Sequence, residues 1–238
     1  MNAQTIAWAA AAIAAVGLAG CSSDSASEES TAAESTSSSP APTSSSSIAA
    51  PPVTTAPPTP APPATPGSLT ITDYLKTAGI TETPVRAGDP GAPRIEFPMP
   101  ALWEQAIDVP GRPFWAIMLK EPQDPTNPPL IEARLSKLSA EVPIQTIFDY
   151  AAGELENLPG YQALGAGGRA SLGGVEAFQI GGLFEENGVR KLVAQKTLLI
   201  ASPTGPFLLR VRATGPEADT PALISATAQL DDNTVITP

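Results

Sequence analysis

Histidine is absent from this 238-residue sequence, and cysteine occurs once, at Cys21. Without an imidazole the chain cannot build a Ser-His-Asp or Cys-His arrangement or a zinc site of the His or Cys type. No glycine-rich segment ends in Lys-Ser or Lys-Thr, so the phosphate-binding P-loop motif is missing as well. Most hydrolase mechanisms are therefore excluded, and we expect a protein that is not an enzyme and that holds no metal or cofactor.

Pairs of carboxylates are the remaining route to acid–base chemistry. Each of three acidic pairs has a simpler explanation at the surface: Glu154 and Glu156 near a helix end on its polar side, Glu185 and Glu186 in a hairpin turn, and Asp231 and Asp232 after the last helix. A catalytic pair of carboxylates is the less favoured alternative.

Basic residues are also scarce. The chain has 13 Lys and Arg against 24 Asp and Glu, and the first basic residue is Lys76. Such a balance argues against nucleic acid as a partner and against adsorption on anionic lipid head groups. Any membrane association must come from another source.

The longest apolar run, from Ile6 to Leu18, is too short for a transmembrane helix but suits a secretory signal. The residues Leu18-Ala19-Gly20-Cys21 that follow resemble the lipobox of bacterial lipoproteins. This resemblance implies cleavage after residue 20 and a diacylglyceryl group on Cys21, which would anchor the chain on the outer face of the cytoplasmic membrane. An ordinary signal peptide followed by an incidental cysteine is the alternative. Residues 1–5 contain no Lys or Arg, so we expect the true start codon further upstream.

Ser, Pro, Ala and Thr dominate residues 21–67, and Ile48 and Val53 are the only larger apolar side chains there. Such a segment cannot bury enough surface to offset its chain entropy, which predicts a disordered linker. Extended as polyproline II, it would reach about 140 Å. Its composition fits a bare spacer or an O-glycosylated stalk.

Residues 68–238 have the composition and length of one folded domain. Thr70 and Asp73 predict a capped first helix that ends at Gly79. A second helix is predicted to begin at Pro143 and continue along an apolar stripe to Leu158. A third is predicted to begin with Thr220 as its cap.

Strands are predicted in the intervals between these helices. Five segments show the pattern: a central strand at 114–119, a half-exposed strand around 131–136, and three consecutive antiparallel strands at 175–184, 192–200 and 207–213. Asn187-Gly188 joins the first two of the consecutive strands and is a strong hairpin motif. Local hairpins with helices grouped at the ends predict an α+β fold with an antiparallel β-sheet flanked by helices.

Candidate ligand-binding residues fall into two groups. Trp103, Phe114 and Trp115 lie close in sequence and could line an apolar pocket, although core packing is the simpler role. A sugar or a lipid head group could be held by four polar residues on or beside strands: Arg134, Lys137, Gln195 and Lys196. A solvated sheet face would give the same pattern.

Several short sequence segments of the domain resemble those of the LpqN-type lipoproteins of mycobacteria (the Lpp-LpqN family). They include Asp73-Tyr74-Leu75, Ile80 to Val85, Gly88 to Pro93, Leu135 to Leu138, Gly153 to Gly160, Val193 to Thr197 and the closing Thr237-Pro238. The resemblance implies a Mog1/PsbP-like fold and a non-enzymatic protein of the cell envelope. It also implies a connection with trehalose-linked glycolipids and with the transporter that exports them.

Two functional hypotheses remain open. The first is a module that binds or chaperones a glycolipid of the acylated trehalose type, and an apolar cavity between helix and sheet would favour it. The second is a scaffold that binds other envelope proteins or host proteins. A shared fold cannot decide between them, because one fold supports many functions.

Overall fold

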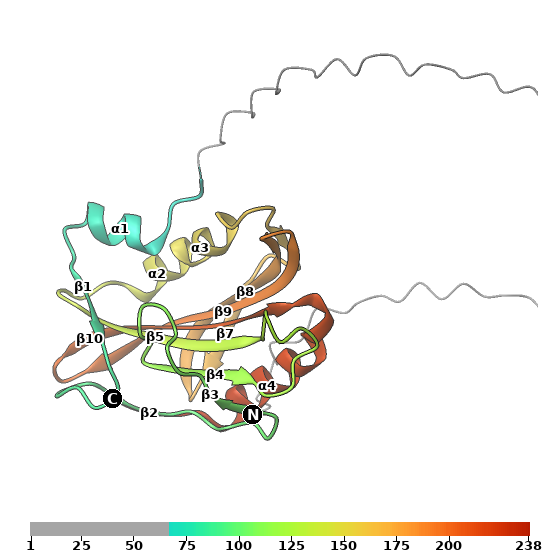
Figure 1. The fold of residues 1–238 in the computed structure, drawn as a ribbon. Coiled ribbons are helices and arrows are strands. Elements are labelled where there is room, and N and C mark those ends of the chain that lie inside the picture. Colours follow the sequence, from blue (N-terminus) through green and yellow to red (C-terminus); the bar gives the residue numbers. More distant parts are fainter. Residues whose placement is uncertain (1–66) are drawn as a thin grey trace, which may run out of the picture. The chain divides into compact units, whose positions relative to one another are not determined.

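The computed structural model describes residues 67–238 (Figure 1). The predicted signal peptide, Cys21 and the linker up to residue 66 lie outside the described residues. Between residues 67 and 238, no helix combines the length and the hydropathy that crossing a bilayer requires.

The described chain forms an α+β domain, as predicted. Its helices are α1 (Ile71–Thr77), α2 (Ile144–Ala151), α3 (Gly153–Glu156) and α4 (Thr220–Asn233), with a 3₁₀ turn at Glu217–Asp219. Its strands are β1 (Glu82–Val85), β2 (Arg94–Glu96), β3 (Trp103–Gln105), β4 (Trp115–Leu119), β5 (Leu130–Leu138), β6 (Gln162–Ala163), β7 (Gly168–Leu172), β8 (Val175–Glu186), β9 (Val189–Ser202), β10 (Gly205–Pro216) and β11 (Val235–Thr237).

One antiparallel sheet organises the domain, in the order β3-β4-β5-β10-β9-β8-β6. Strand β1 pairs with β5, strand β7 pairs with β8, and β11 pairs with β2 in a separate two-stranded sheet. The predicted hairpin between β8 and β9 is confirmed: Asn187 and Gly188 have φ angles of 53° and 77°, which suit a tight two-residue turn. Strand β4 has neighbours on both sides but lies second from the sheet edge, so it is less central than its apolar sequence predicts.

Helices cover both faces of this sheet (Figure 1). On one face, α4 packs Leu223, Ala226 and Leu230 onto apolar side chains that include Leu209 and Val211 of β10. On the other face, α1, α2 and α3 pack on two further apolar clusters. The strand alternation of β10 explains the division, because successive side chains point to opposite faces.

Helix α1 begins as predicted. Thr70 accepts a hydrogen bond from the Asp73 backbone N–H, and the Asp73 carboxylate accepts one from the Thr70 N–H, which completes a capping box.

The prediction of one continuous helix from Pro143 to Leu158 is wrong, because the chain forms two helices, α2 and α3, that are separated between Ala151 and Gly153. The break lies where the entering segment crosses: a Cβ at Gly153 would stand 2.1 Å from the Leu69 carbonyl oxygen. The Asn157 side chain then donates a hydrogen bond of 2.7 Å to the Ser68 carbonyl. Glycine at 153 therefore lets the start of the domain lie directly on α3.

Helix α4 differs from its prediction at both ends. Thr220 is not the cap but the first helical residue, and its hydroxyl donates to the Glu217 carbonyl. Asp231 and Asp232 do not follow the helix but lie within its last turn. Asp231 consequently points into the domain, where its side chain is 5% exposed.

Candidate functional site

A cluster of polar side chains lies on the helix-covered face that carries α3. The antiparallel register places Arg212 of β10 opposite Glu132 of β5 on one side and opposite Gln195 of β9 on the other. Two residues further along, Arg210 lies opposite Arg134. We call the following residues the polar cluster: Glu82, Glu132, Arg134, Glu154, Gln195, Arg210 and Arg212.

Glu154 of α3 connects the centre of the cluster. The Arg212 Nε donates to Gln195 Oε1 at 2.9 Å, and Gln195 Nε2 donates to Glu154 Oε2 at 3.0 Å. The second oxygen of Glu154 lies 3.0 Å from Arg210 Nε. Glu154 thus fixes two strand arginines and one amide from the helix side, and all three side chains are oriented before any ligand arrives.

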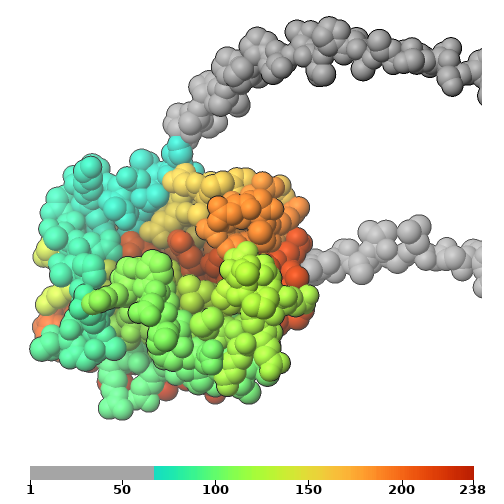
Figure 2. All heavy atoms as spheres, viewed as in Figure 1, coloured from blue at the N-terminus to red at the C-terminus, as the bar shows by residue number. Residues whose placement is uncertain are grey.

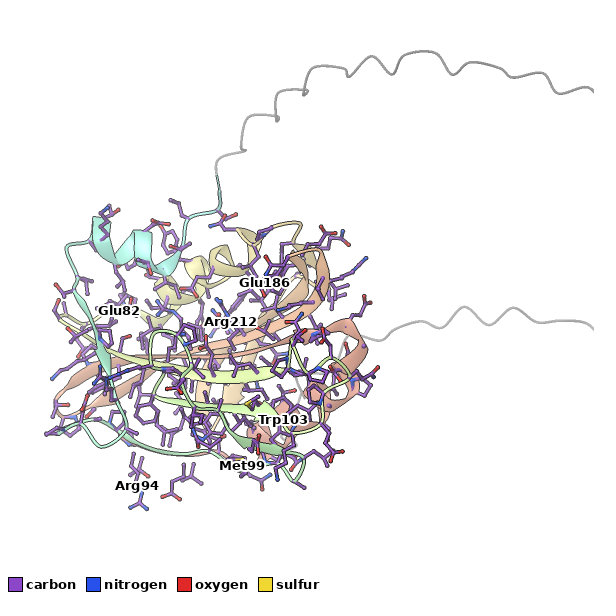
Figure 3. All side chains as sticks on the ribbon, viewed as in Figure 1. Glu82, Arg94, Met99, Trp103, Glu186 and Arg212 are labelled. Atoms are coloured by element: carbon purple, nitrogen blue, oxygen red, sulfur yellow. The ribbon has the colours of Figure 1, made fainter. Side chains whose placement is uncertain are left out.

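Arg210 extends this network toward β1. Its guanidinium donates to Glu82 Oε1 at 2.7 Å (Figure 3 labels Glu82 and Arg212). Burial alone would raise the pKa of Glu82, but hydrogen bonds from Arg210 and Ser136 and the charge of Arg210 lower it overall. Three arginines therefore face three carboxylates, as ionised groups in a largely buried setting require.

The cluster reaches solvent through two of its arginines. The side chains of Arg134 and Arg212 are 41% and 31% exposed, whereas those of Glu132, Glu154 and Arg210 are 12–15% exposed. Burial lowers the pKa of the Arg212 guanidinium, and the neighbouring Glu154 and Glu132 act in the opposite direction. An incoming polar group would meet the Arg212 guanidinium, because that of Arg134 is already bonded to Glu132 and to the Pro110 carbonyl.

Beside Arg134 lies an open cavity of about 590 Å³ formed by the β3–β4 connection. It is lined by residues 105, 106 and 108–116, including Phe114 and Trp115. The loop stands at the front of the domain in Figure 2, where it is green. Arg134 links cavity and cluster, because its Nη2 donates to the Pro110 carbonyl at 2.9 Å and to Glu132 at 2.7 Å.

Four of the seven candidate residues from the sequence belong either to the cavity or to the polar cluster. Phe114 and Trp115 line the cavity, Arg134 contacts its loop, and Gln195 lies in the polar cluster. Both aromatic side chains pack against the core on the α4 side, where Trp115 stacks on Phe97 at 4.5 Å between ring centroids. Because Trp115 lies opposite Ala133 and Ala116 opposite Glu132, the Trp115 side chain is on the sheet face away from the polar cluster.

The other three candidates lie elsewhere. Trp103 is 3% exposed in the core beneath α4, which agrees with the packing alternative. Lys137 lies on the exposed part of β5 with its ammonium 5.8 Å from the Phe207 ring centroid. Lys196 points to the α4 face, is 1% exposed, and contacts Asp231 at 2.5 Å, so it cannot reach the polar cluster.

Sequence reasoning missed Glu154, Arg210 and Arg212. The expectation that Glu154 faces solvent is wrong: its side chain is 15% exposed and paired with both arginines. One pattern could have revealed the arginines. In β10 the two arginines alternate with Leu209, Val211 and Ala213, so one face of the strand is charged and the other is apolar. On a central strand both faces are covered, and this pattern therefore predicts that the arginines are partly buried and paired with carboxylates.

The arrangement offers fixed hydrogen-bond donors and acceptors side by side. Guanidinium and amide groups donate, carboxylates accept, and an open cavity formed by the β3–β4 connection lies beside Arg134. A polyhydroxylated group could use both kinds of partner at once. Within residues 67–238 no group of His, Cys, Asp and Glu has the arrangement of a metal site.

Fold and site together define the class of this protein: an α+β domain with helices on both faces of one antiparallel sheet and a charge-balanced polar cluster. The chain belongs to the LpqN lipoprotein family, since the family model described as "Probable lipoprotein LpqN" matches residues 67–237. The predicted resemblance is thereby confirmed.

Two comparisons with individual proteins agree. Lipoprotein LpqN of Mycobacterium tuberculosis is 41% identical over 169 residues, which are 71% of this chain and 74% of that protein. The crystal structure of LpqN "involved in cell envelope biogenesis of Mycobacterium tuberculosis" is 41% identical and has a TM-score of 0.68. That match covers 72% of this chain and 99% of the crystallised one.

Proposed function

We propose that this protein is a lipid-anchored lipoprotein of the cell envelope, without enzymatic activity, that binds the sugar head group of a glycolipid. The observation that carries the proposal is the Arg212–Gln195–Glu154 arrangement near the open cavity of the β3–β4 connection. Membership of a lipoprotein family supports the lipid anchor. The M. tuberculosis relative is described as involved in cell envelope biogenesis, which supports a location in the cell envelope.

The proposal concerns the sugar head group of the glycolipid, and the packing of the domain supports this choice. Between the helices and the sheet, apolar side chains such as Phe148, Leu155 and Leu208 are packed into two clusters. The cavity of about 590 Å³ is open and lies instead in the β3–β4 loop, next to charged groups. This favours recognition of the hydroxyl-rich head group, with the acyl chain outside the domain core.

In this proposal the role is to hold an acylated sugar of the trehalose type near the membrane and pass it to or from an export protein. The linker would give the domain its reach, and the acyl group on Cys21 would keep it at the outer face of the membrane. Sugar hydroxyls both donate and accept hydrogen bonds, which matches the mixed arginine and carboxylate lining.

Binding of octanoyl trehalose to the chain from residue 21 onward, with Cys21→Ala, tests the proposal by calorimetry. Arg212→Gln should weaken binding by about 10- to 100-fold, since a hydrogen bond to a charged group is worth roughly 1.5–3 kcal/mol. The matched control is Arg94→Gln, because Arg94 forms an exposed ion pair with Glu96 on the separate two-stranded sheet. Absence of binding to the parent chain, or equal weakening by both substitutions, would refute the proposal.

A scaffold role is the second candidate, and one observation favours it. Strand β3 is the edge of the main sheet, and Leu102 and Ile107 on either side of it are 69% and 80% exposed. Unpaired edge strands with apolar neighbours can accept an added strand from a partner. Cross-linking in delipidated envelope extract should then yield a protein partner that Leu102→Lys abolishes.

A further inference from the structure

The β3–β4 loop cannot be held in place by its own sequence alone. Ile107, Asp108, Pro110, Gly111 and Arg112 are all exposed. Asp108 and Arg112 adopt the left-handed backbone region, with φ angles of 58° and 46°, which is unfavourable for residues other than glycine. Such a conformation persists only when the surroundings fix it, so the contacts that the loop makes with the sheet are decisive.

Arg134 makes such a contact from the floor of the sheet. Its Nη2 donates to the Pro110 carbonyl at 2.9 Å. The same guanidinium is held by Glu132, to which Nε and Nη2 donate at 3.0 and 2.7 Å. Because Glu132 is largely buried, it orients Arg134 rigidly toward the loop.

Gly111 completes the contact from the loop side. Its φ angle of +76° suits glycine, and a Cβ at this position would lie 2.7 Å from Arg134 Nη1. A side chain at residue 111 would therefore displace the guanidinium from its present position, and the φ angle disfavours any residue other than glycine there.

We infer that Arg134 is a positioning residue that latches the β3–β4 loop onto the sheet and thereby sets the wall of the cavity. It acts on a ligand through the loop. Its planar group bonds Glu132 and Pro110 simultaneously, whereas a lysine ammonium lacks this rigid fork. That the cavity binds a ligand rests on the proposed function. The contact between Arg134 and the loop does not depend on it, because the contact is present in the chain without a ligand.

Hydrogen–deuterium exchange of the Ala106 and Arg112 amides, which donate to the Ala116 and Val109 carbonyls, tests the latch in the chain from residue 21 onward, with Cys21→Ala and no ligand. Both Arg134→Gln and Arg134→Lys should speed exchange in this loop by about tenfold, because a charge-assisted hydrogen bond that closes the loop is lost. Arg94→Gln is the matched control, since Arg94 also pairs with a glutamate two residues away on a strand. Unchanged loop exchange in Arg134→Gln would overturn the inference.

Gly111→Ala provides a second, independent variant. Its Cβ would crowd the same contact from the loop, so the part of its effect that acts through Arg134 should be absent in the double variant Arg134→Gln/Gly111→Ala, while the part due to the φ angle of +76° remains. Additive effects of the two substitutions would mean that they act through different contacts and would contradict the latch.

Octanoyl trehalose separates this inference from the proposed function. If the parent chain binds the sugar, Arg134→Lys should shorten the residence time of the sugar while the unfolding temperature stays that of the control. An unchanged residence time despite a loosened loop would overturn the positioning role. If the parent chain binds no octanoyl trehalose, the proposed function fails, and the exchange experiment alone decides the role of Arg134.

Discussion

The buried ion pair between Lys196 and Asp231 gives the sharpest stability prediction. Lys196 Nζ lies 2.5 Å from Asp231 Oδ1 and donates to the Ser171 carbonyl at 3.0 Å. The two side chains are 1% and 5% exposed, so this contact joins α4 to β9 almost without solvent. Lys196→Met keeps most of the volume and removes the charge, which leaves the Asp231 carboxylate buried without its cation.

Breaking a buried pair in this way costs about 3–5 kcal/mol. For a domain of this length that corresponds to a fall of roughly 6–20 °C in the unfolding temperature. Replacing both members, as in Lys196→Met/Asp231→Leu, should recover most of the loss, because no uncompensated charge remains. A residual cost of about 1 kcal/mol is expected from the Ser171 carbonyl, which loses its donor.

Urea unfolding followed by tryptophan fluorescence measures these differences, with Trp103 and Trp115 as reporters inside the domain. Arg94→Met is the control, since exposed pairs contribute at most about 1 kcal/mol. A loss below about 1 kcal/mol in Lys196→Met, or a double variant less stable than the single, would refute the reasoning.

The pair also predicts a dependence on pH. Burial lowers the pKa of Lys196 below its ordinary value of 10.5, although the hydrogen bond and charge of Asp231 raise it. The unfolded chain then binds the proton more tightly than the folded chain. Stability should therefore rise with pH between the folded pKa and 10.5, a contribution that Lys196→Met removes.

Three further predictions concern other parts of the chain. Gly153→Ala should destabilise the domain by about 2–4 kcal/mol, because its Cβ would meet the Leu69 carbonyl at 2.1 Å; chemical unfolding measures this, and Gly165→Ala, which has open space around its Cβ, is the control. The pKa of Glu82 is lower in the folded chain than its ordinary value of 4.5, so the ionised carboxylate stabilises the domain above pH 4.5. This stabilisation should be lost as the pH falls from 4.5 through the pKa of the folded state, and a Glu82→Gln variant should lack this part of the acid transition. Cys21→Ala should shift the protein from the membrane fraction to the medium and leave the unfolding temperature unchanged.

Each of these predictions has an outcome that contradicts it. Equal stability of Gly153→Ala and Gly165→Ala would mean that the entering segment does not lie on α3 in solution. The same acid transition with and without Glu82 would remove the role given to the Arg210 pair. Retention of Cys21→Ala in salt-washed membranes would refute the lipid anchor.

Local patterns in the sequence were sufficient for most of the secondary structure. The Thr70 capping box, the Asn187-Gly188 hairpin and the alternation along β5 and β10 are each set by a few neighbouring residues. Such features depend on backbone conformation and side-chain periodicity, which short segments carry by themselves. The α+β class followed from the order of these elements.

The failures occurred where a distant segment decides the outcome. Nothing near Gly153 shows that the Leu69 carbonyl will cross there and break the helix. The sequence predicts that Glu154 and Asp231 are exposed at the surface, because their arginine and lysine partners lie far away in sequence. Strand alternation places Gln195 and Lys196 on opposite faces, but nothing near them in sequence shows that Glu154 covers one face and Asp231 the other.

The sequence by itself determined the absence of histidine, the composition of residues 21–67 and the family of the domain, and it predicts a lipobox at Cys21. These depend only on which residues are present and in what order. The tertiary structure alone decided that Arg210 and Arg212 meet Glu154, and that Arg134 meets the loop at Pro110. Ion pairs and loop contacts of this kind arise from strand register and packing, which join residues that the chain keeps apart.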